Sequence, residues 1–378
     1  MSITTSVAGP YYSSGTISFS SLRTNFRAQQ ADGTFLTDTA SISASELKRS
    51  TGNVSNPIVP NATENAPISS SNSNISLEDF RNSIKFYNAT QSGTDLNLDI
   101  SSISWNNNLT KNIVKKLFVT GAVGSNSTSD PAAEISTTYV KNLTISVSGT
   151  IRGASGPGGQ YGVSGGNGGA GGYALDIQSN TNGYNVEVFV DSPGRVQGGG
   201  GGGGAGAQGA TGNDGTCNEE TTLQGCGGVS GCPSGWSQEG GTWSGNCCQT
   251  YCKWCGFNQC GCQPCSQWLQ YRKCKNSYST SGGTGGDGGD GGPGRGYDNL
   301  LGSLAGSDGG SGGSGGGCGA GDGGTGGTGG KGGKFGSPGE SPENGGSGGP
   351  AGAAINGTNY TVSGSTNSPN IKGTYLST

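Results

Sequence analysis

One pattern repeats every three residues in Asp322-Gly-Gly-Thr325-Gly-Gly-Thr328-Gly-Gly-Lys331-Gly-Gly-Lys334, and again in Thr284-Gly-Gly-Asp287-Gly-Gly-Asp290-Gly-Gly-Pro293. A left-handed polyproline-II-type helix has about three residues per turn, so each run places its side chains on one edge and leaves two edges of bare backbone. Bare edges let neighbouring segments approach closely enough for N–H to C=O hydrogen bonds, with weak Cα–H to O contacts added. We therefore expect packed polyglycine-II helices.

The glycine-rich segments that fit this expectation are residues 153–172, 198–215, 282–296, 309–319 and 321–333. A flexible linker is the alternative, but a strict period favours packing because it matters only where neighbouring chains must match. Collagen is disfavoured, since its repeat has one glycine per triplet and abundant proline. The Asp-Gly-Gly units resemble calcium-binding β-helix repeats but lack their apolar position, so calcium binding stays open.

The composition limits the classes of protein that fit. Glycine supplies 81 of 378 residues and hydrophobic residues only 29%, so one large apolar core is not expected. The net charge of -4 comes without any long basic run, which argues against a nucleic-acid partner. Apolar runs such as 186–190 are far shorter than the ~20 residues of a membrane span. The first residues show no secretory signal, so we expect folding in the cytoplasm of the producing cell.

The sequence contains no histidine. This removes the commonest general base, the Ser-His and Cys-His nucleophile pairs, and the commonest metal ligand. The carboxylates are dispersed and none is framed by apolar residues that would shift its pKa. We predict no catalytic residues and no enzyme activity.

Three similar segments near the N-terminus each predict the start of a short α-helix: residues 17–23, 42–48 and 75–81. A serine serves as N-cap in each segment. In the second segment, Glu46 at the third helical position completes a capping box with Ser43. The isoleucine before each cap is placed to pack on Leu22, Leu47 or Phe80. Such short helices need packing partners, either one another in a loose N-terminal domain or another subunit.

Beyond residue 137 the period becomes two, which predicts a strand over residues 143–151. Residues 173–177 and 185–190 flank a turn and predict a hairpin, and residues 354–355 and 360–362 predict further strands. These strands bracket the glycine-rich segments and are expected to frame one β domain. The expected fold is mainly β with packed polyglycine-II helices, short capped α-helices at the N-terminus and a small cysteine-rich insert.

The insert holds eleven of the twelve cysteines. Two Cys-x-x-Cys pairs, Cys252 with Cys255 and Cys262 with Cys265, have a spacing that fits zinc, the only cofactor predicted as an alternative to none. Disulfides are favoured, because four thiolates leave many cysteines unexplained and a domain this small needs cross-links. Six bridges require Cys318 to tie the insert to the glycine-rich part. The disulfide or metal candidates are Cys217, Cys226, Cys232, Cys247, Cys248, Cys252, Cys255, Cys260, Cys262, Cys265, Cys274 and Cys318.

Four of the five tryptophans also lie in the insert. These rings either form the core of a small domain together with the sulfurs, or form an exposed face that stacks on sugars or anchors a protein surface. The receptor-binding candidates are Trp236, Trp243, Tyr251, Trp254, Phe257, Trp268 and Tyr271.

The Gly-Gly-x tracts between residues 153 and 352 resemble those of the glycine-rich tip adhesins on the long tail fibres of T-even-type phages. The N-terminal segments Ile-Ser-Phe-Ser-Ser-Leu-Arg and Ile-Ser-Leu-Glu-Asp-Phe-Arg resemble recurring motifs in virion proteins of cyanophages. In the adhesins, packed polyglycine-II helices present variable loops that bind the bacterial surface. The resemblance implies that residues 217–274 are the corresponding loop. This long cysteine-rich insert departs from the adhesin pattern, so the receptor does not carry over.

Together these observations predict four regions: a virion-attachment segment with short helices (1–135), β strands with the first glycine-rich helices (136–216), the cysteine- and tryptophan-rich insert (217–278), and glycine-rich helices with C-terminal strands (279–378). The predicted function is that of a virion tail-fibre or spike adhesin, a homo-oligomer such as a trimer. Its partners are other virion proteins and a host surface glycan or outer-membrane protein. The alternatives are a purely architectural collar, baseplate or fibre protein, and a secreted glycine-rich matrix or ice-binding protein.

Overall fold

In a computed structural model the described part of the chain is mainly β, with short 3-10 helices. It comprises residues 3–8, 16–18, 22, 47, 49, 59, 64–71, 75–83, 86–105, 114–136, 143–162, 166–177, 186–226, 231–238, 243–246, 251–255, 258–263 and 268–375. The chain divides into two compact units. The first unit comprises Met1–Ala207, Gly288–Asp308 and Gly327–Thr378, and the second comprises Gln208–Asp287 and Gly309–Gly326.

The strands of the first unit form three sheets, which the chain visits in turn. The first sheet has the order β1 (Ile3–Ala8), β2 (Phe86–Gln91), β5 (Val114–Val119), β8 (Leu143–Val147), β11 (Val186–Val190) and β20 (Tyr360–Gly364). The second has the order β21 (Ile371–Lys372), β12 (Arg195–Gln197), β9 (Thr150–Arg152), β6 (Ala122–Gly124) and β3 (Thr94–Leu96). The third has the order β19 (Ile355–Gly357), β10 (Leu175–Ile177), β7 (Ala133–Ile135) and β4 (Leu98–Asp99).

From β2 onwards these strands pair in parallel, because the chain returns to the same sheet after every third strand. We call this arrangement the β-coil. Strand β1 pairs antiparallel with β2 and covers one edge of the first sheet. The predicted hairpin of residues 173–190 is wrong: β10 pairs with β7 and β19, whereas β11 pairs with β8 and β20. Each strand instead pairs in parallel with strands that are distant in the chain, which no local turn pattern encodes.

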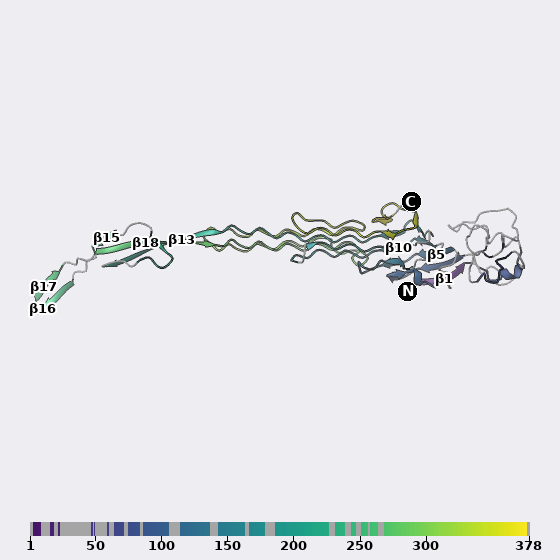
Figure 1. Cartoon of the computed structure of the whole chain (residues 1–378), viewed down its shortest axis with the longest axis horizontal. Helices are drawn as coiled ribbons and strands as arrows, with labels where there is room; N and C mark the ends of the chain where they lie inside the picture. The colour runs from purple at the N-terminus through teal and green to yellow at the C-terminus, as the bar shows by residue number, and fades with distance from the viewer. Residues whose placement is uncertain are drawn as a thin grey trace. The chain divides into compact units, whose positions relative to one another are not determined.

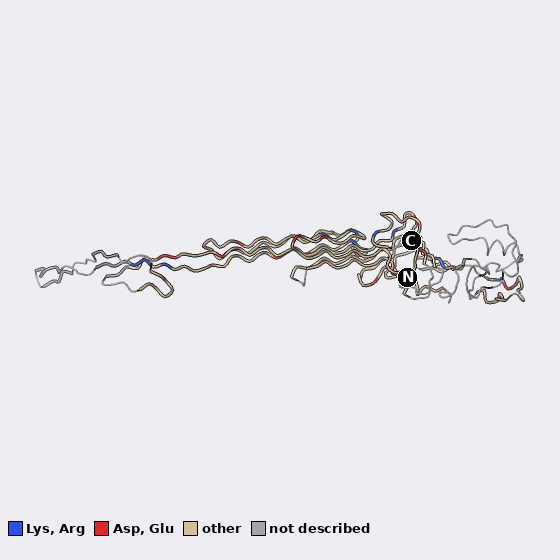
Figure 2. Tube along the Cα trace, turned by 45° about the horizontal axis from the view of Figure 1, so that its top comes forward, with Lys and Arg blue, Asp and Glu red and all other residues tan. Residues whose placement is uncertain are grey.

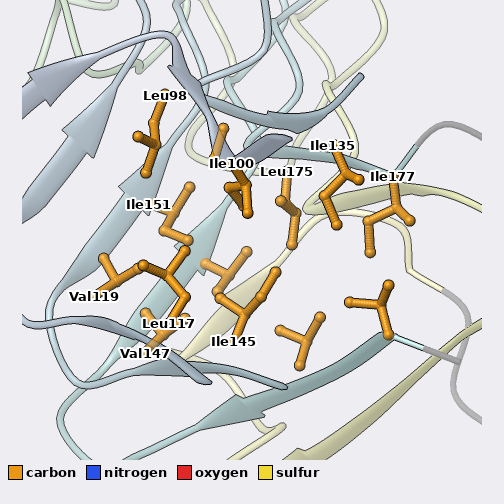
Figure 3. Close-up of a cluster of buried hydrophobic side chains, with 14 of the residues drawn as sticks. Leu98, Ile100, Leu117, Val119, Ile135, Ile145, Val147, Ile151, Leu175 and Ile177 are labelled. Atoms are coloured by element: carbon orange, nitrogen blue, oxygen red, sulfur yellow. The ribbon is translucent and has the colours of Figure 1, made fainter. Parts of the chain in front are cut away.

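The interior of the β-coil is filled by apolar side chains stacked in register. Leu117, Ile145 and Val188 lie side by side on neighbouring strands of the first sheet, and all three are completely buried. Figure 3 shows the aliphatic side chains of several strands converging on this core. The strict inward alternation in β8 and β11 explains the period of two seen in the sequence.

A second buried cluster collects equivalent residues of the three N-terminal segments, Leu22, Leu47 and Phe80, each at most 1% exposed. Ile75, the residue before the third cap, packs against this cluster. The segments therefore contribute to one shared core, in agreement with the packing that was expected of these leucine and phenylalanine positions.

The third N-terminal segment forms the 3-10 helix η1 (Leu77–Phe80), not the predicted α-helix. Ser76 is its N-cap: the Glu78 amide donates to Ser76 Oγ (3.2 Å), and the Ser76 amide donates to Asp79 Oδ2 (2.8 Å). Arg81 has extended backbone, so the helix ends after a single turn, too short to become α-helical. The predicted helices at residues 17–23 and 42–48 lie outside the described residues, apart from isolated positions.

Glycine segments enter and leave the β-coil between its second and third sheets. After β9 the chain continues into residues 153–160 and returns through 166–172 to β10; after β12 it continues into 198–207, and residues 337–352 lead back to β19. The hydrogen bonding between neighbouring strands continues into the first residues of the glycine segments. The Gly153 amide donates to Gln197 O (3.0 Å), and the Gly198 amide donates to Lys372 O (2.9 Å). The roughly 4.8 Å spacing of the strands therefore sets the spacing of the glycine segments.

These segments, with residues 288–296 and 327–333, form the glycine array, whose backbone is neither β-strand nor α-helix (Figure 1). Its centre is the segment 199–206. The amides of three successive residues, Gly199 to Gly201, donate to three different segments, and the next three amides repeat the rotation. The acceptors are Gly172 O (2.9 Å), Arg295 O (2.7 Å), Ser337 O (3.1 Å), Gly169 O (2.9 Å), Gly292 O (2.8 Å) and Glu340 O (3.0 Å).

The carbonyls of the central segment accept hydrogen bonds from three further segments, 156–159, 327–333 and 346–352. It therefore has six neighbours, and the pattern has a period of three residues. Glycine is required here by space: a Cβ at any of positions 199–204 would lie 1.7–2.1 Å from a neighbouring carbonyl oxygen. Figure 2 shows that most of the glycine array carries neither acidic nor basic residues.

In the second unit, glycine segments 208–214, 281–287, 309–316 and 321–326 are joined by the same kind of hydrogen bond. The Gly209 and Gly212 amides donate to Gly286 O and Gly283 O, both at 2.8 Å. Segments 208–214 and 281–287 continue directly into β13 (Gly215–Cys226) and β18 (Trp268–Thr280), which pair antiparallel over their described length (Figure 1). The predicted insert thus begins where glycine gives way to a hairpin.

Candidate functional sites

The insert is built on the hairpin of β13 and β18. Two short strands, β14 (Ser237–Gln238) and β15 (Trp243–Asn246), also pair with β18. A separate hairpin is formed by β16 (Tyr251–Cys255) and β17 (Asn258–Gln263). A two-stranded hairpin is at best marginally stable by itself, so cross-links are expected to stabilise it.

Among the described residues, two disulfides stabilise this region. Cys217 of β13 is bonded to Cys318, with 4.9 Å between the Cα atoms, and Cys232 is bonded to Cys274 of β18, with 5.6 Å between the Cα atoms. Cys318 lies in the turn between segments 309–316 and 321–326 and has a φ of 53°. This bond ties the insert to the glycine-rich part, as the sequence analysis expected of Cys318. The disulfide prediction is thus confirmed for these four cysteines.

The other eight cysteines have side chains outside the described residues. In the backbone, Cys252 of β16 is the register partner of Cys262 of β17, which brings one cysteine from each predicted Cys-x-x-Cys pair together on this hairpin. Cys265 lies outside the described residues. Zinc at Cys252, Cys255, Cys262 and Cys265 and further disulfides both stay predictions.

The aromatic candidates are spread over the whole insert. Trp236 is half-buried and sits in a turn, where its amide donates to Pro233 O (3.0 Å). In the backbone, Trp243 is the register partner of Tyr271, and Asn246 is the partner of Trp268. The side chains of Trp243, Tyr271 and Trp268 are outside the described residues, as are those of Tyr251, Trp254 and Phe257. A receptor-binding role for the seven aromatic residues stays a prediction.

Polar cross-strand contacts at the base of the hairpin escaped the sequence analysis. The Tyr278 hydroxyl donates to Glu219 Oε1 (3.0 Å), and this hydrogen bond raises the pKa of the tyrosine. Ser277 Oγ donates to Asn218 Oδ1 (2.7 Å). Neither residues 215–220 nor residues 275–280 alternate between apolar and polar residues, so no local pattern in the sequence indicated this pairing.

A row of carboxylates crosses the outer face of the third sheet. Asp99, Glu134 and Asp176 are register partners on β4, β7 and β10. Burial, followed by the negative charges of Asp99, Asp176 and Asp130, raises the pKa of Glu134. Because the pKa is higher in the folded than in the unfolded chain, the ionised form of Glu134 opposes folding, and protonation relieves this as the pH falls through the folded pKa.

Glu134→Gln is therefore expected to raise the midpoint of thermal unfolding at pH 7. The gain should shrink and disappear as the pH is lowered towards 4, because the native carboxyl is then protonated in the wild type as well. Circular dichroism melts at several pH values measure both effects. Glu343→Gln, at an exposed carboxylate of the same unit, serves as the control and should leave the midpoint unchanged. A gain independent of pH would contradict the electrostatic explanation.

A loop of the first unit presents exposed leucines from a closely hydrogen-bonded frame. Leu301 is 96% exposed, although the Arg295 guanidinium donates to Leu300 O (2.5 Å) and Gly302 O (3.3 Å). Asn299 Nδ2 donates to Gly294 O (2.8 Å). Leu300 (40% exposed) and Leu301 thus lie exposed side by side on this loop.

Among the described residues no group of three or more metal-ligating side chains is placed to hold an ion. Within the same residues no helix has the length and apolarity needed to cross a membrane.

The sequence profile of the phage tail fibre adhesin Gp38 family matches residues 84–307, more than half of the chain. The chain belongs to this family, and it is a tail-fibre adhesin located in the virion. Among solved structures, the chain is similar to the gp37-gp38 adhesin tip complex of the bacteriophage S16 long tail fiber, with 17% identity, a TM-score of 0.37 and coverage of 81% of this chain and 89% of that chain. The comparison with curated protein sequences found no match.

Proposed function

We propose that this adhesin binds the host cell surface through the insert of residues 217–278, which a scaffold of packed polyglycine-II helices carries. The membership in a tail-fibre adhesin family supports the role, and the placement of the aromatic residues and disulfides in one insert supports the location. The receptor is a surface glycan or an outer-membrane protein, since flat rings suit sugars and protein surfaces alike.

The hydrogen bonds of the glycine array are the observation that supports the scaffold. A helix with three residues per turn directs successive amides to three sides, and only such a helix can donate to three neighbours in rotation and accept from three others. Among the described residues the segments hydrogen-bond to one another, apart from the turn in which the Gly345 amide donates to Pro342 O (3.2 Å), so each segment is stable only within the array. We therefore interpret the segments as polyglycine-II helices.

The first unit is proposed to attach the adhesin to other virion proteins. Residues 1–135 contribute the buried cluster around Leu22, Leu47 and Phe80 and the first turns of the β-coil. Exposed apolar side chains such as Leu96 and Leu301 suit a protein contact. Assembly as a homo-oligomer belongs to the same proposal.

Competition for adsorption tests the proposed function. Purified chain added in excess to host cells should block adsorption of the phage. A shortened chain, in which Asn-Gly replaces residues 221–274 and joins the register partners Glu220 and Lys275, should not block it. This change keeps the disulfide between Cys217 and Cys318. If the shortened chain melts like the wild type and still competes fully, the insert is not the receptor-binding part, and a purely architectural role for it is favoured.

A further inference from the structure

The outer face of the first sheet carries a pocket of about 350 Å³, within the size range of small-ligand sites. It lies on β5, β8, β11 and β20 of the β-coil, in the first unit, whereas the insert belongs to the second. Two phenyl rings, two carboxylates and several hydroxyls line it. The pocket is thus separate from the receptor-binding site proposed above.

The two phenyl rings bracket a narrow gap. Phe118 of β5 and Phe189 of β11 are both register partners of Ser146 on β8, so the three side chains form one row on the same face. Neighbouring strands are about 4.8 Å apart, which places the two phenylalanine backbones about 9.6 Å apart. Because serine is small, the space above it can accommodate a six-membered ring between the two phenylalanine side chains.

Polar groups lie around this gap. Thr144 Oγ1 and Ser363 Oγ each donate to Glu187 at 3.2 Å, and Ser146 Oγ donates to Asp191 Oδ2 at 3.0 Å. A carboxylate has about four lone-pair sites, so both acids can accept additional hydrogen bonds from a ligand. The pocket also contains Lys116, a single positive charge against the two negative ones.

We propose that this pocket binds one pyranose ring of a saccharide. A sugar ring has two apolar faces for the phenyl rings and hydroxyl donors for Glu187 and Asp191. A purely apolar side chain in the same gap would remove water from both carboxylates without replacing its hydrogen bonds, which is unfavourable. The first unit is thus an accessory glycan-binding element, whose contact is independent of the insert.

The test uses the full-length chain in saturation-transfer NMR and calorimetry with glucose, galactose, N-acetylglucosamine and heptose. At least one of these sugars should bind with a dissociation constant of about 1 mM, as expected for contact with a single sugar ring. Phe118→Ala with Phe189→Ala should weaken binding at least tenfold. Tyr173→Ala removes an exposed ring elsewhere in the same unit and should leave binding unchanged. If the double variant does not fold, Ser146→Phe, which fills the gap, should give the same loss.

Three results would overturn the proposal: no binding of any of the four sugars, unchanged binding by the variants, or loss of the folded double variant from assembled particles. The last result would make this face a docking surface for another virion protein. The chain shortened at residues 221–274 should keep its sugar binding. Failure of the proposed receptor site and failure of this pocket are therefore distinguishable.

Discussion

Replacing Gly202 by alanine is expected to lower the free energy of unfolding of the glycine array by about 3 kcal/mol or more. The new Cβ would lie 1.8 Å from Pro157 O and 2.4 Å from Pro157 C, so backbone, not a flexible side chain, would have to move. Gly202 also donates to Gly169 O at 2.9 Å and accepts from the Gly349 amide at 2.7 Å. Displacing one segment therefore breaks hydrogen bonds to several others at once.

Chemical denaturation and amide hydrogen exchange over residues 199–206 measure this effect. The control is Gly310→Ala, in a glycine segment of the second unit, because its Cβ would have no neighbour closer than 3.5 Å, an ordinary contact with Asp287 N. This variant should be neutral or gain about 0.4–1 kcal/mol through the lower entropy of its unfolded chain. Equal effects of the two substitutions would show that close backbone packing does not stabilise the array.

Removal of the disulfide between Cys217 and Cys318 is expected to destabilise the base of the insert by about 4 kcal/mol. The bond closes a loop with a sequence separation of 101 residues, so it removes much entropy from the unfolded chain. The variant is Cys217→Ala with Cys318→Gly, because the φ of 53° at position 318 favours glycine once the bond is gone.

Hydrogen exchange of residues 215–220 and 275–280, which pair at the base of the hairpin, reports this loss. Dithiothreitol should give wild-type protein a similar loss of protection and leave the variant's base unchanged. Cys232→Ala with Cys274→Ala is the comparison, and it should cost somewhat less, since its bond spans only 42 residues. Undiminished protection of the base in the first variant would contradict the expected role of this bond.

Much of the fold follows from local pattern. The alternation over residues 143–151 predicted a strand that appears as β8 and β9, and the strand signal at residue 360 appears as β20. The period of three in the glycine segments recurs in their hydrogen bonds. Patterns of this kind report what each residue does locally, so they survive folding wherever no stronger contact competes.

The sequence did not indicate which strands pair with one another. Nothing near residues 175–190 indicates that β10 belongs to one sheet and β11 to another, because both pair with strands far away in the chain. For the same reason the outer pocket escaped notice: Phe118, Ser146 and Phe189 become neighbours only through the register of three strands. The capped N-terminal segment was predicted only in part: its cap at Ser76 is present, but the helix ends after one turn because the backbone is extended at Arg81.

The rotation of hydrogen bonds around residues 199–206 has a consequence for how such a scaffold changes length. Adding or removing one residue within a segment would turn every later amide towards the wrong neighbour, whereas adding three would restore the phase. Insertions and deletions within the segments are therefore expected in multiples of three residues. Adjoining segments must lengthen or shorten together. Turns at the segment ends are free of this constraint, so variation in loop length and sequence can accumulate there without disturbing the lattice beneath.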